Sequence, residues 1–286
     1  MDSVTRRFAQ VDVFSAIGTA GNPVAVVLDA GGPEPVTEEQ MAAFARWTNL
    51  SETTFVLPPT DPAADYRLRI FTPGGELPFA GHPTLGSAHA WLTSGGRPQG
   101  EDIVQECGVG LVRIRRSGAR LSFAAPPLRR SGPVDADTVA RVVAALGLDP
   151  AEVVAAEWVD NGPEWMVVQV GSGERVLEVR PDVPALGDLK VGLLGLYDAG
   201  SVDSGGAFAE VRAFVPGIGV PEDPVTGSLN AGIATWLRAI GRAPADYVAA
   251  QGAAIGRAGR IHVHDDGEDI WIGGDTATVI EGTVAL

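Results

Sequence analysis

The chain has 286 residues and a formal net charge of −15 at pH 7. A chain of this length buries a full core without disulfides, and its single cysteine, Cys107, cannot form one within the chain. The excess of acidic residues opposes binding to nucleic acid and to anionic membrane surfaces. No segment has the pattern of a signal peptide or a membrane-spanning helix. We therefore expect a soluble, cytoplasmic protein without nucleic-acid or membrane partners.

The first half of the chain alternates predicted strands with predicted helices. The β-branched runs that predict strands are residues 6–14, 22–28, 53–58, 66–71 and 108–114. Residues 37–48 predict an amphipathic helix, and Thr37 followed by Gln40 predicts its cap. Small residues after Pro83 predict a second helix, with His82 just ahead of its N-terminus. The unpaired N–H groups of such a terminus attract anions.

The second half shows a similar alternation. Residues 137–147 predict a helix that Gly147 ends, and a further helix is expected after Pro224. Residues 165–170 and 210–215 predict strands. The proline-rich segment from Ala124 to Pro133 is the best candidate for a linker between the halves.

Residues 210–237 repeat features of residues 67–92. Five positions match at a spacing of 143 residues: Arg69, Phe71, Pro73, Gly74 and Pro78 with Arg212, Phe214, Pro216, Gly217 and Pro221. Three more match at a spacing of 141 residues: Pro83, Gly86 and Ser87 with Pro224, Gly227 and Ser228. The repeat predicts an internal duplication into two similar α+β domains that enclose a cleft. His82 and Asp223 would then stand at facing helix termini, although chance matches of turn residues also remain open.

Four polar residues are candidates for chemistry, and each also has a structural explanation. Glu52 precedes a strand and is either a solvated turn carboxylate or a general acid/base whose pKa burial raises. Asp223 and Ser228 are either substrate ligands or caps of the helix after Pro224. His82 is either a catalytic group or a hydrogen-bonded structural residue.

Other functional motifs are missing from the sequence. It contains no phosphate-binding loop, no H-E-x-x-H and no C-x-x-C pair. His262 and His264 alternate along one predicted strand without an obvious third ligand. We therefore expect no metal site.

Several long motifs resemble the PhzF-like phenazine-biosynthesis family. They are VDVFSAIGTAGNPVAVVL, NLSETTFVLPP, IFTPGGELPFAGHPTLGSAHA, EVRAFVPGIGVPEDPVTGSLNAG and AQGAAIGRAGRIHV, which together run from Val11 to Val263. The resemblance implies an α+β fold of two pseudo-symmetric diaminopimelate epimerase-like domains, each a sheet wrapped around a central helix, with the site in the cleft between them. The expected domains are residues 1–127, completed by residues 277–286, and residues 128–276.

The resemblance also implies an activity and a set of site residues. The founding activity of the family is isomerisation of a dihydro-hydroxyanthranilate, in which one proton moves along a conjugated system. Glu52 would be the acid/base, and the substrate would be held by His82, Asp223, Ser228 and the backbone of Gly81 and Gly227. The resemblance implies no metal, nucleotide or flavin, and it implies a homodimer.

The sequence departs from the family pattern at two positions and lacks a feature of related epimerases. Ala258 replaces a common proline in QGAAIGRAG, and Leu229 stands where a smaller residue is common and could reshape the pocket. Because no cysteine stands at either predicted helix start, two-thiol racemisation is not expected. We expect a cofactor-independent isomerase of a small anionic or amino-acid-like substrate. The alternative is a non-catalytic protein of the same fold that binds a small molecule or a partner.

Overall fold

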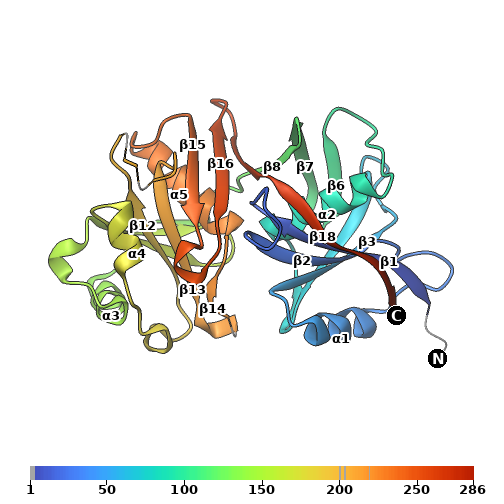
Figure 1. Cartoon of the computed structure of the whole chain (residues 1–286), viewed down its shortest axis with the longest axis horizontal. Coiled ribbons are helices and arrows are strands. Elements are labelled where there is room, and N and C mark those ends of the chain that lie inside the picture. The colour runs from blue at the N-terminus through green and yellow to red at the C-terminus, as the bar shows by residue number, and fades with distance from the viewer. Residues whose placement is uncertain (1–3, 200, 203, 219) are drawn as a thin grey trace. The chain divides into compact units, whose positions relative to one another are not determined.

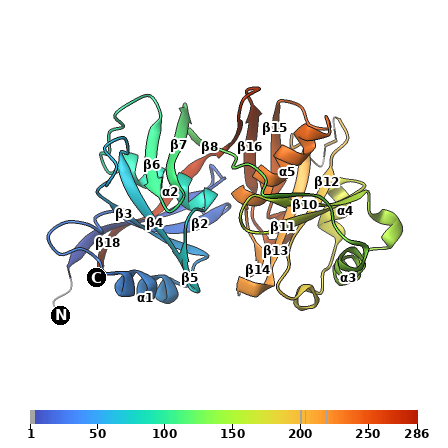
Figure 2. The same cartoon turned by 180° about the vertical axis from the view of Figure 1, so that it is seen from behind.

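The computed structural model describes residues 4–199, 201–202, 204–218 and 220–286. The chain divides into two compact units (Figures 1 and 2). Unit 1 comprises Met1–Ala124 and Gly273–Leu286, and unit 2 comprises Ala125–Ile272. The boundaries expected from the sequence, after residues 127 and 276, stand a few residues beyond those of the units.

Unit 1 is built on a mixed sheet. Its strands are β1 (Thr5–Val13), β2 (Asn22–Val27), β3 (Glu52–Leu57), β4 (Tyr66–Thr72), β5 (Gly75–Leu77), β6 (Ile103–Cys107), β7 (Gly110–Ser117), β8 (Arg120–Ala124) and β18 (Thr276–Ala285). Strand β18 pairs antiparallel with β1, and β1 pairs antiparallel with β2. Strand β3 runs parallel to β2 and antiparallel to β4. Strand β4 also forms a hairpin with β5 and a parallel pair with β6.

Unit 2 repeats this order of pairings. Its strands are β9 (Arg130–Pro133), β10 (Ala155–Asp160), β11 (Trp165–Val170), β12 (Lys190–Leu196), β13 (Ala209–Val215), β14 (Val220–Asp223), β15 (Asp246–Gln251) and β16 (Gly259–Asp265), while β17 (Ile270–Gly274) spans the boundary of the units. Strand β12 runs parallel to β11 and antiparallel to β13. Strand β13 forms a hairpin with β14 and a parallel pair with β15. The shared topology agrees with an internal duplication.

Each unit encloses one helix in its sheet (Figures 1 and 2). The helices are α1 (Glu38–Thr48) and α2 (Gly81–Thr93) in unit 1, and α3 (Ala136–Leu146), α4 (Gly173–Glu178) and α5 (Gly227–Ala239) in unit 2. Short 3₁₀ turns are η1 (Pro150–Glu152), η2 (Val183–Leu186), η3 (Pro216–Ile218) and η4 (Ala253–Ile255). Helix α2 packs against β1, β2 and β3, and α5 packs against β10 and β11. Because these two helices are surrounded by strands, both are apolar on most sides.

The surface helices follow the capping signals in the sequence. Thr37 and Gln40 form a capping box at the start of α1, which confirms the predicted cap. Gly147 ends α3 in the left-handed conformation, as predicted, and Asp135 caps its start. The predicted strands of both halves are also present.

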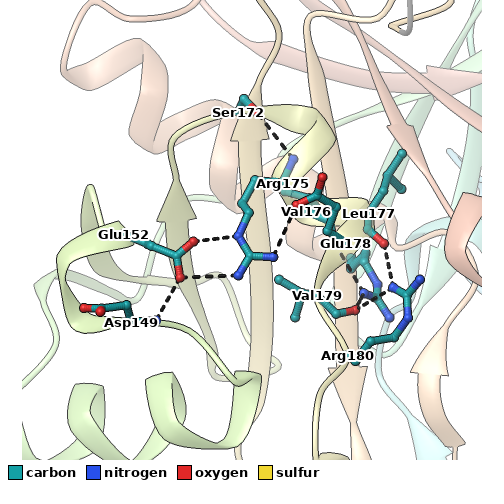
Figure 3. Close-up of polar contacts among 10 residues, drawn as sticks. Asp149, Glu152, Ser172, Arg175, Val176, Leu177, Glu178, Val179 and Arg180 are labelled. Carbon is teal, nitrogen blue, oxygen red and sulfur yellow. Dashed lines mark hydrogen bonds and ion pairs between the residues drawn. The ribbon is translucent and has the colours of Figure 1, made fainter.

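Helix α4 is the counterpart of α1 but spans only Gly173–Glu178. A helix of this length is not stable alone, so side-chain contacts must hold it. Ser172 accepts a hydrogen bond from the backbone N–H of Arg175, and Nε of Arg175 donates to Glu152 at 2.6 Å (Figure 3). These contacts fix α4 next to η1.

Three expectations about element boundaries are wrong. Helix α2 begins at Gly81, so His82 is its second residue rather than the residue before it. The helix expected after Pro224 is present as α5, but it begins at Gly227, so Pro224 is not its first residue as the match with Pro83 implied. The end of the expected linker forms β9, which pairs with β10 and thereby satisfies its backbone groups.

Each unit has its own apolar core. The unit 1 cluster includes Val27, Met41, Phe44, Phe55 and Phe71. The unit 2 cluster includes Val143, Leu146, Trp158, Val168 and Leu193. Within the described residues, no helix is long and apolar enough to cross a membrane.

Candidate active site

Glu52 is the first residue of β3, beside Val24 in the parallel register of β2 and β3. Its side chain is 13 % exposed, which excludes the solvated turn carboxylate considered from the sequence. Burial raises the pKa of the Glu52 carboxyl to about 7, and a hydrogen bond from the Ser51 side chain opposes part of that rise. Glu52 therefore changes its charge close to neutral pH.

His82 lies next to Glu52, on the first turn of α2. Its Nε2 atom is 3.2 Å from Oε2 of Glu52, and its side chain is 6 % exposed. The two atoms are close without the alignment of a hydrogen bond. An imidazole and a carboxyl at this distance can share or exchange a proton with a group bound beside them. Unit 1 thus brings together two of the predicted site residues.

The duplicated positions in unit 2 carry different chemistry. Lys190 is the first residue of β12 and pairs with Trp165 of the parallel strand β11. Its position therefore matches that of Glu52, the first residue of β3, which pairs with Val24 of the parallel strand β2. Ser228 is the second residue of α5, as His82 is of α2, at a spacing of 146 residues. The spacing of 141 residues suggested by Pro83 and Pro224 is therefore wrong. At these two positions unit 1 carries a carboxyl group and an imidazole, whereas unit 2 carries Lys190 and Ser228.

Asp223 ends β14 and belongs to a buried hydrogen-bond network ahead of α5. The hydroxyl of Thr226, the residue that precedes α5, donates to Oδ2 of Asp223 at 2.6 Å. Gln251, at the end of β15, is 1 % exposed. Its Nε2 donates to the Asp223 carbonyl at 3.0 Å and to Thr226 Oγ1 at 2.9 Å. Its Oε1 accepts from the Thr226 N–H at 3.0 Å and from Asn230 Nδ2 at 2.9 Å.

This network explains two features of the chain. Because Thr226 accepts from Gln251, its hydroxyl proton is directed to Asp223, which thereby acts as an acceptor. Asp223 does not cap α5 directly, contrary to one of the two sequence interpretations. Sequence reasoning missed Thr226 and Gln251, although Gln251 opens the motif QGAAIGRAG.

Replacing Gln251 with Ala should lower the free energy of unfolding by about 2 kcal/mol, since the buried N–H of Thr226 and its neighbours lose their partner. Urea unfolding of the two proteins at pH 7 measures this difference. A loss below about 0.5 kcal/mol would mean that the network contributes little to the stability of unit 2.

The remaining predicted site residues lie on the first turns of α2 and α5. Gly81 and Gly227 are the first residues of these helices, and both are buried. Ser228 is partly exposed, and its side chain accepts a hydrogen bond from Trp165 rather than capping α5. Asp223, Gly227 and Ser228 are thus gathered in unit 2, whereas Glu52, Gly81 and His82 are gathered in unit 1.

The two departures from the family pattern have different surroundings in unit 2. Leu229 is fully buried. Its side chain packs against Gly192 of β12, where an added Cβ would lie only 2.6 Å from the Cδ1 atom of Leu229. It therefore fills the core of unit 2. Ala258 is exposed between η4 and β16. In the described part of the chain, no three His, Cys, Asp or Glu side chains are grouped to hold a metal ion.

Comparisons with known proteins place the chain among isomerases. The family model PhzC-PhzF, described as phenazine biosynthesis-like protein, matches residues 11–282. The trans-2,3-dihydro-3-hydroxyanthranilate isomerase of Pseudomonas aeruginosa is 32 % identical, with 98 % of this chain and 99 % of the relative covered. An uncharacterized isomerase of Mesorhizobium japonicum is 37 % identical, with 91 % and 90 % covered. The solved structure of a PhzF family protein from Enterococcus faecalis is 24 % identical, covers 99 % of this chain and all of that chain, and gives a TM-score of 0.80. These matches confirm the α+β fold and support an isomerase-type enzyme.

Proposed function

The chain belongs to the PhzC-PhzF family of phenazine biosynthesis-like proteins, and from this premise we propose that it is a cofactor-independent isomerase that moves a proton within a small carboxylic acid. The single observation that carries the proposal is the buried Glu52 carboxyl, 3.2 Å from His82. Because burial raises the pKa of Glu52 to about 7, the group can take up and return a proton at neutral pH.

In the proposed reaction, the Glu52 carboxylate removes a proton from one carbon of the substrate. The electron pair of the broken C–H bond shifts the double bond, and Glu52 returns the proton to another carbon. The reaction is redox-neutral, since the same group accepts and donates the proton. His82 would contact the substrate beside Glu52 and polarise the group on which charge develops.

Unit 2, taken by itself, also carries groups that suit a small carboxylic acid. Asp223, which the Thr226 hydroxyl fixes as an acceptor, suits an amino or hydroxyl group. In unit 2, Ser228 and the backbone N–H of Gly227 at the first turn of α5 suit a carboxylate, and in unit 1 the backbone N–H of Gly81 at the first turn of α2 suits one as well. A substrate similar to trans-2,3-dihydro-3-hydroxyanthranilate carries all of these groups.

The rate should depend on pH through Glu52. The ionised carboxylate is the form that removes the proton, so kcat/KM should rise as the pH passes through about 7. Between pH 6 and pH 8 we expect a rise of about tenfold, which follows from the fraction ionised. Initial rates over this range measure the profile, and equal kcat/KM values across it would contradict the assignment of Glu52 as the base.

A panel of small acids tests the proposed function. Wild-type protein is incubated with trans-2,3-dihydro-3-hydroxyanthranilate and with related cyclic and amino-substituted acids, and NMR identifies any isomer formed. Formation of an isomer supports the proposal. If an acid binds measurably but every member of the panel is recovered unchanged, the non-catalytic binding protein is favoured instead.

A further inference from the structure

Ser228 is held by two side chains, one from the tight turn between β10 and β11 and one from the first residue of β11. The turn is closed by Asp160, whose Oδ1 atom accepts from the N–H groups of Gly162 at 2.6 Å and Glu164 at 2.8 Å. Gly162 has φ +140°, and Glu164 has φ +63°. A non-glycine residue in the left-handed region is strained, so the surrounding contacts must impose this turn. It brings Asn161 and Trp165 to the first turn of α5.

Asn161 and Trp165 contact different parts of Ser228. The Nδ2 atom of Asn161 donates to the backbone carbonyl of Ser228 at 2.8 Å, which anchors its main chain. Trp165 is 3 % exposed, and its Nε1 atom donates to Oγ of Ser228 at 3.0 Å. In unit 1, Val24 pairs with Glu52 as Trp165 pairs with Lys190, and Val24 has no side-chain donor. This arrangement therefore belongs to the second unit.

The contact with Trp165 makes the Ser228 oxygen a hydrogen-bond acceptor. An indole N–H can only donate, so Oγ of Ser228 is the acceptor in this bond. The single hydroxyl proton of Ser228 must then point to a different group. Within the described residues, Ser228 donates no hydrogen bond of its own. Ser228 is partly exposed, so the residue can contact a bound molecule.

We propose that Trp165 is a positioning residue that holds the Ser228 hydroxyl as a hydrogen-bond donor to a carboxylate of the substrate. The Trp165 N–H occupies one of the two lone pairs of Oγ and leaves the hydroxyl proton for another group, which favours an anionic acceptor at that place. The inference rests on the proposed function, because that function supplies a carboxylic acid as the ligand of Ser228.

The indole signal of Trp165 tests this role without any turnover. In ¹H–¹⁵N spectra, Trp165→Phe identifies the signal by removing it, and Ser228→Ala should shift it because the acceptor is lost. Benzoate serves as the probe because it is a small carboxylate, and benzamide is its uncharged control. Benzoate should move the Trp165 signal of the wild type further than benzamide does and leave that of Ser228→Ala in place. A wild-type signal that stays in place at saturating benzoate would overturn the proposal.

Benzoate binding gives a second readout. Trp165→Phe should weaken it about tenfold, since Ser228 is no longer fixed as a donor. Trp158→Phe is the matched control, because Trp158 is also buried but its ring lies under the Arg130 guanidinium. It should leave benzoate affinity unchanged. Equal losses in the two variants would show that Trp165 acts only through packing.

The same titration in Glu52→Gln separates this inference from the proposed function. If Glu52 is not the catalytic group, the kinetics of Glu52→Gln reveal it while the benzoate response of Trp165 persists. If Trp165 does not position Ser228, the benzoate response is missing although Glu52→Gln still loses activity.

Discussion

Glu52→Gln should reduce turnover by about a thousandfold, because the amide cannot accept and return a proton. Gln has nearly the shape of Glu, so the neighbouring His82 and the start of β3 should keep their places. The kcat of wild type and variant, measured on the best acid of the panel, gives the comparison. Turnover within a few-fold of wild type would exclude Glu52 as the acid/base.

The same substitution should increase stability at alkaline pH. Burial raises the pKa of Glu52 from 4.5 to about 7, so between these values the folded state binds the proton more tightly than the unfolded state. Wild-type stability therefore falls as the pH rises through this window, and the loss is complete above it. The amide of the variant stays neutral, so Glu52→Gln should be more stable than wild type by about 3 kcal/mol at pH 8 and nearly equal to it at pH 4.

Urea unfolding at pH 4 and pH 8 tests this second effect. The exposed Glu281 on β18 provides a matched control, since Glu281→Gln removes a carboxylate without removing a buried charge. The free energy of unfolding of Glu281→Gln should equal that of wild type at both pH values. If the free energy of unfolding of Glu52→Gln also equals that of wild type at both pH values, Glu52 does not titrate near neutrality.

Gly232→Ala should lower the free energy of unfolding by about 3 kcal/mol through overpacking. In an ordinary helix, Gly→Ala stabilises by about 1 kcal/mol, so the expected sign is reversed. Gly232 lies in α5, where an added Cβ would stand 2.4 Å from the carbonyl oxygen of Val159 in β10. Because this neighbour is backbone, the helix itself must move.

Gly282→Ala is a suitable control for this substitution. Gly282 lies in β18, and nothing is within 4 Å of a Cβ added there. Urea unfolding at pH 7 should therefore show a clear loss for Gly232→Ala and little change for Gly282→Ala. Equal free energies of unfolding for the two variants would contradict the close packing of α5 against β10.

Local signals predicted α1 and α3 correctly, whereas the short helix α4 was not predicted. Thr37 with Gln40 and the terminal Gly147 mark helix ends through contacts within a few residues, which a sequence displays directly. The start of α5 is different, because Thr226 is held there by Gln251, 25 residues away in the sequence. Pro224 suggested that the helix starts earlier. Matching Pro83 with Pro224 therefore gave the wrong sequence alignment of the two units in this region.

The site could be predicted only in part for the same reason. Glu52 and His82 are 30 residues apart, and their contact depends on how α2 packs against β3. The family resemblance supplied their expected roles, but the sequence could not give the burial that raises the pKa of Glu52. Trp165 carries no sequence signal of a polar role, because its contact with Ser228 joins β11 to α5.

Deuterium uptake tests the central claim, that Glu52 moves a substrate proton, most directly. The acid that wild type isomerises is incubated in heavy water with wild type and with Glu52→Gln, and NMR and mass spectrometry follow the label over many turnovers. Wild type should place deuterium on the carbon that is reprotonated, because the Glu52 carboxyl exchanges with solvent, and Glu52→Gln should place none. Deuterium uptake by Glu52→Gln at the wild-type rate would contradict the account.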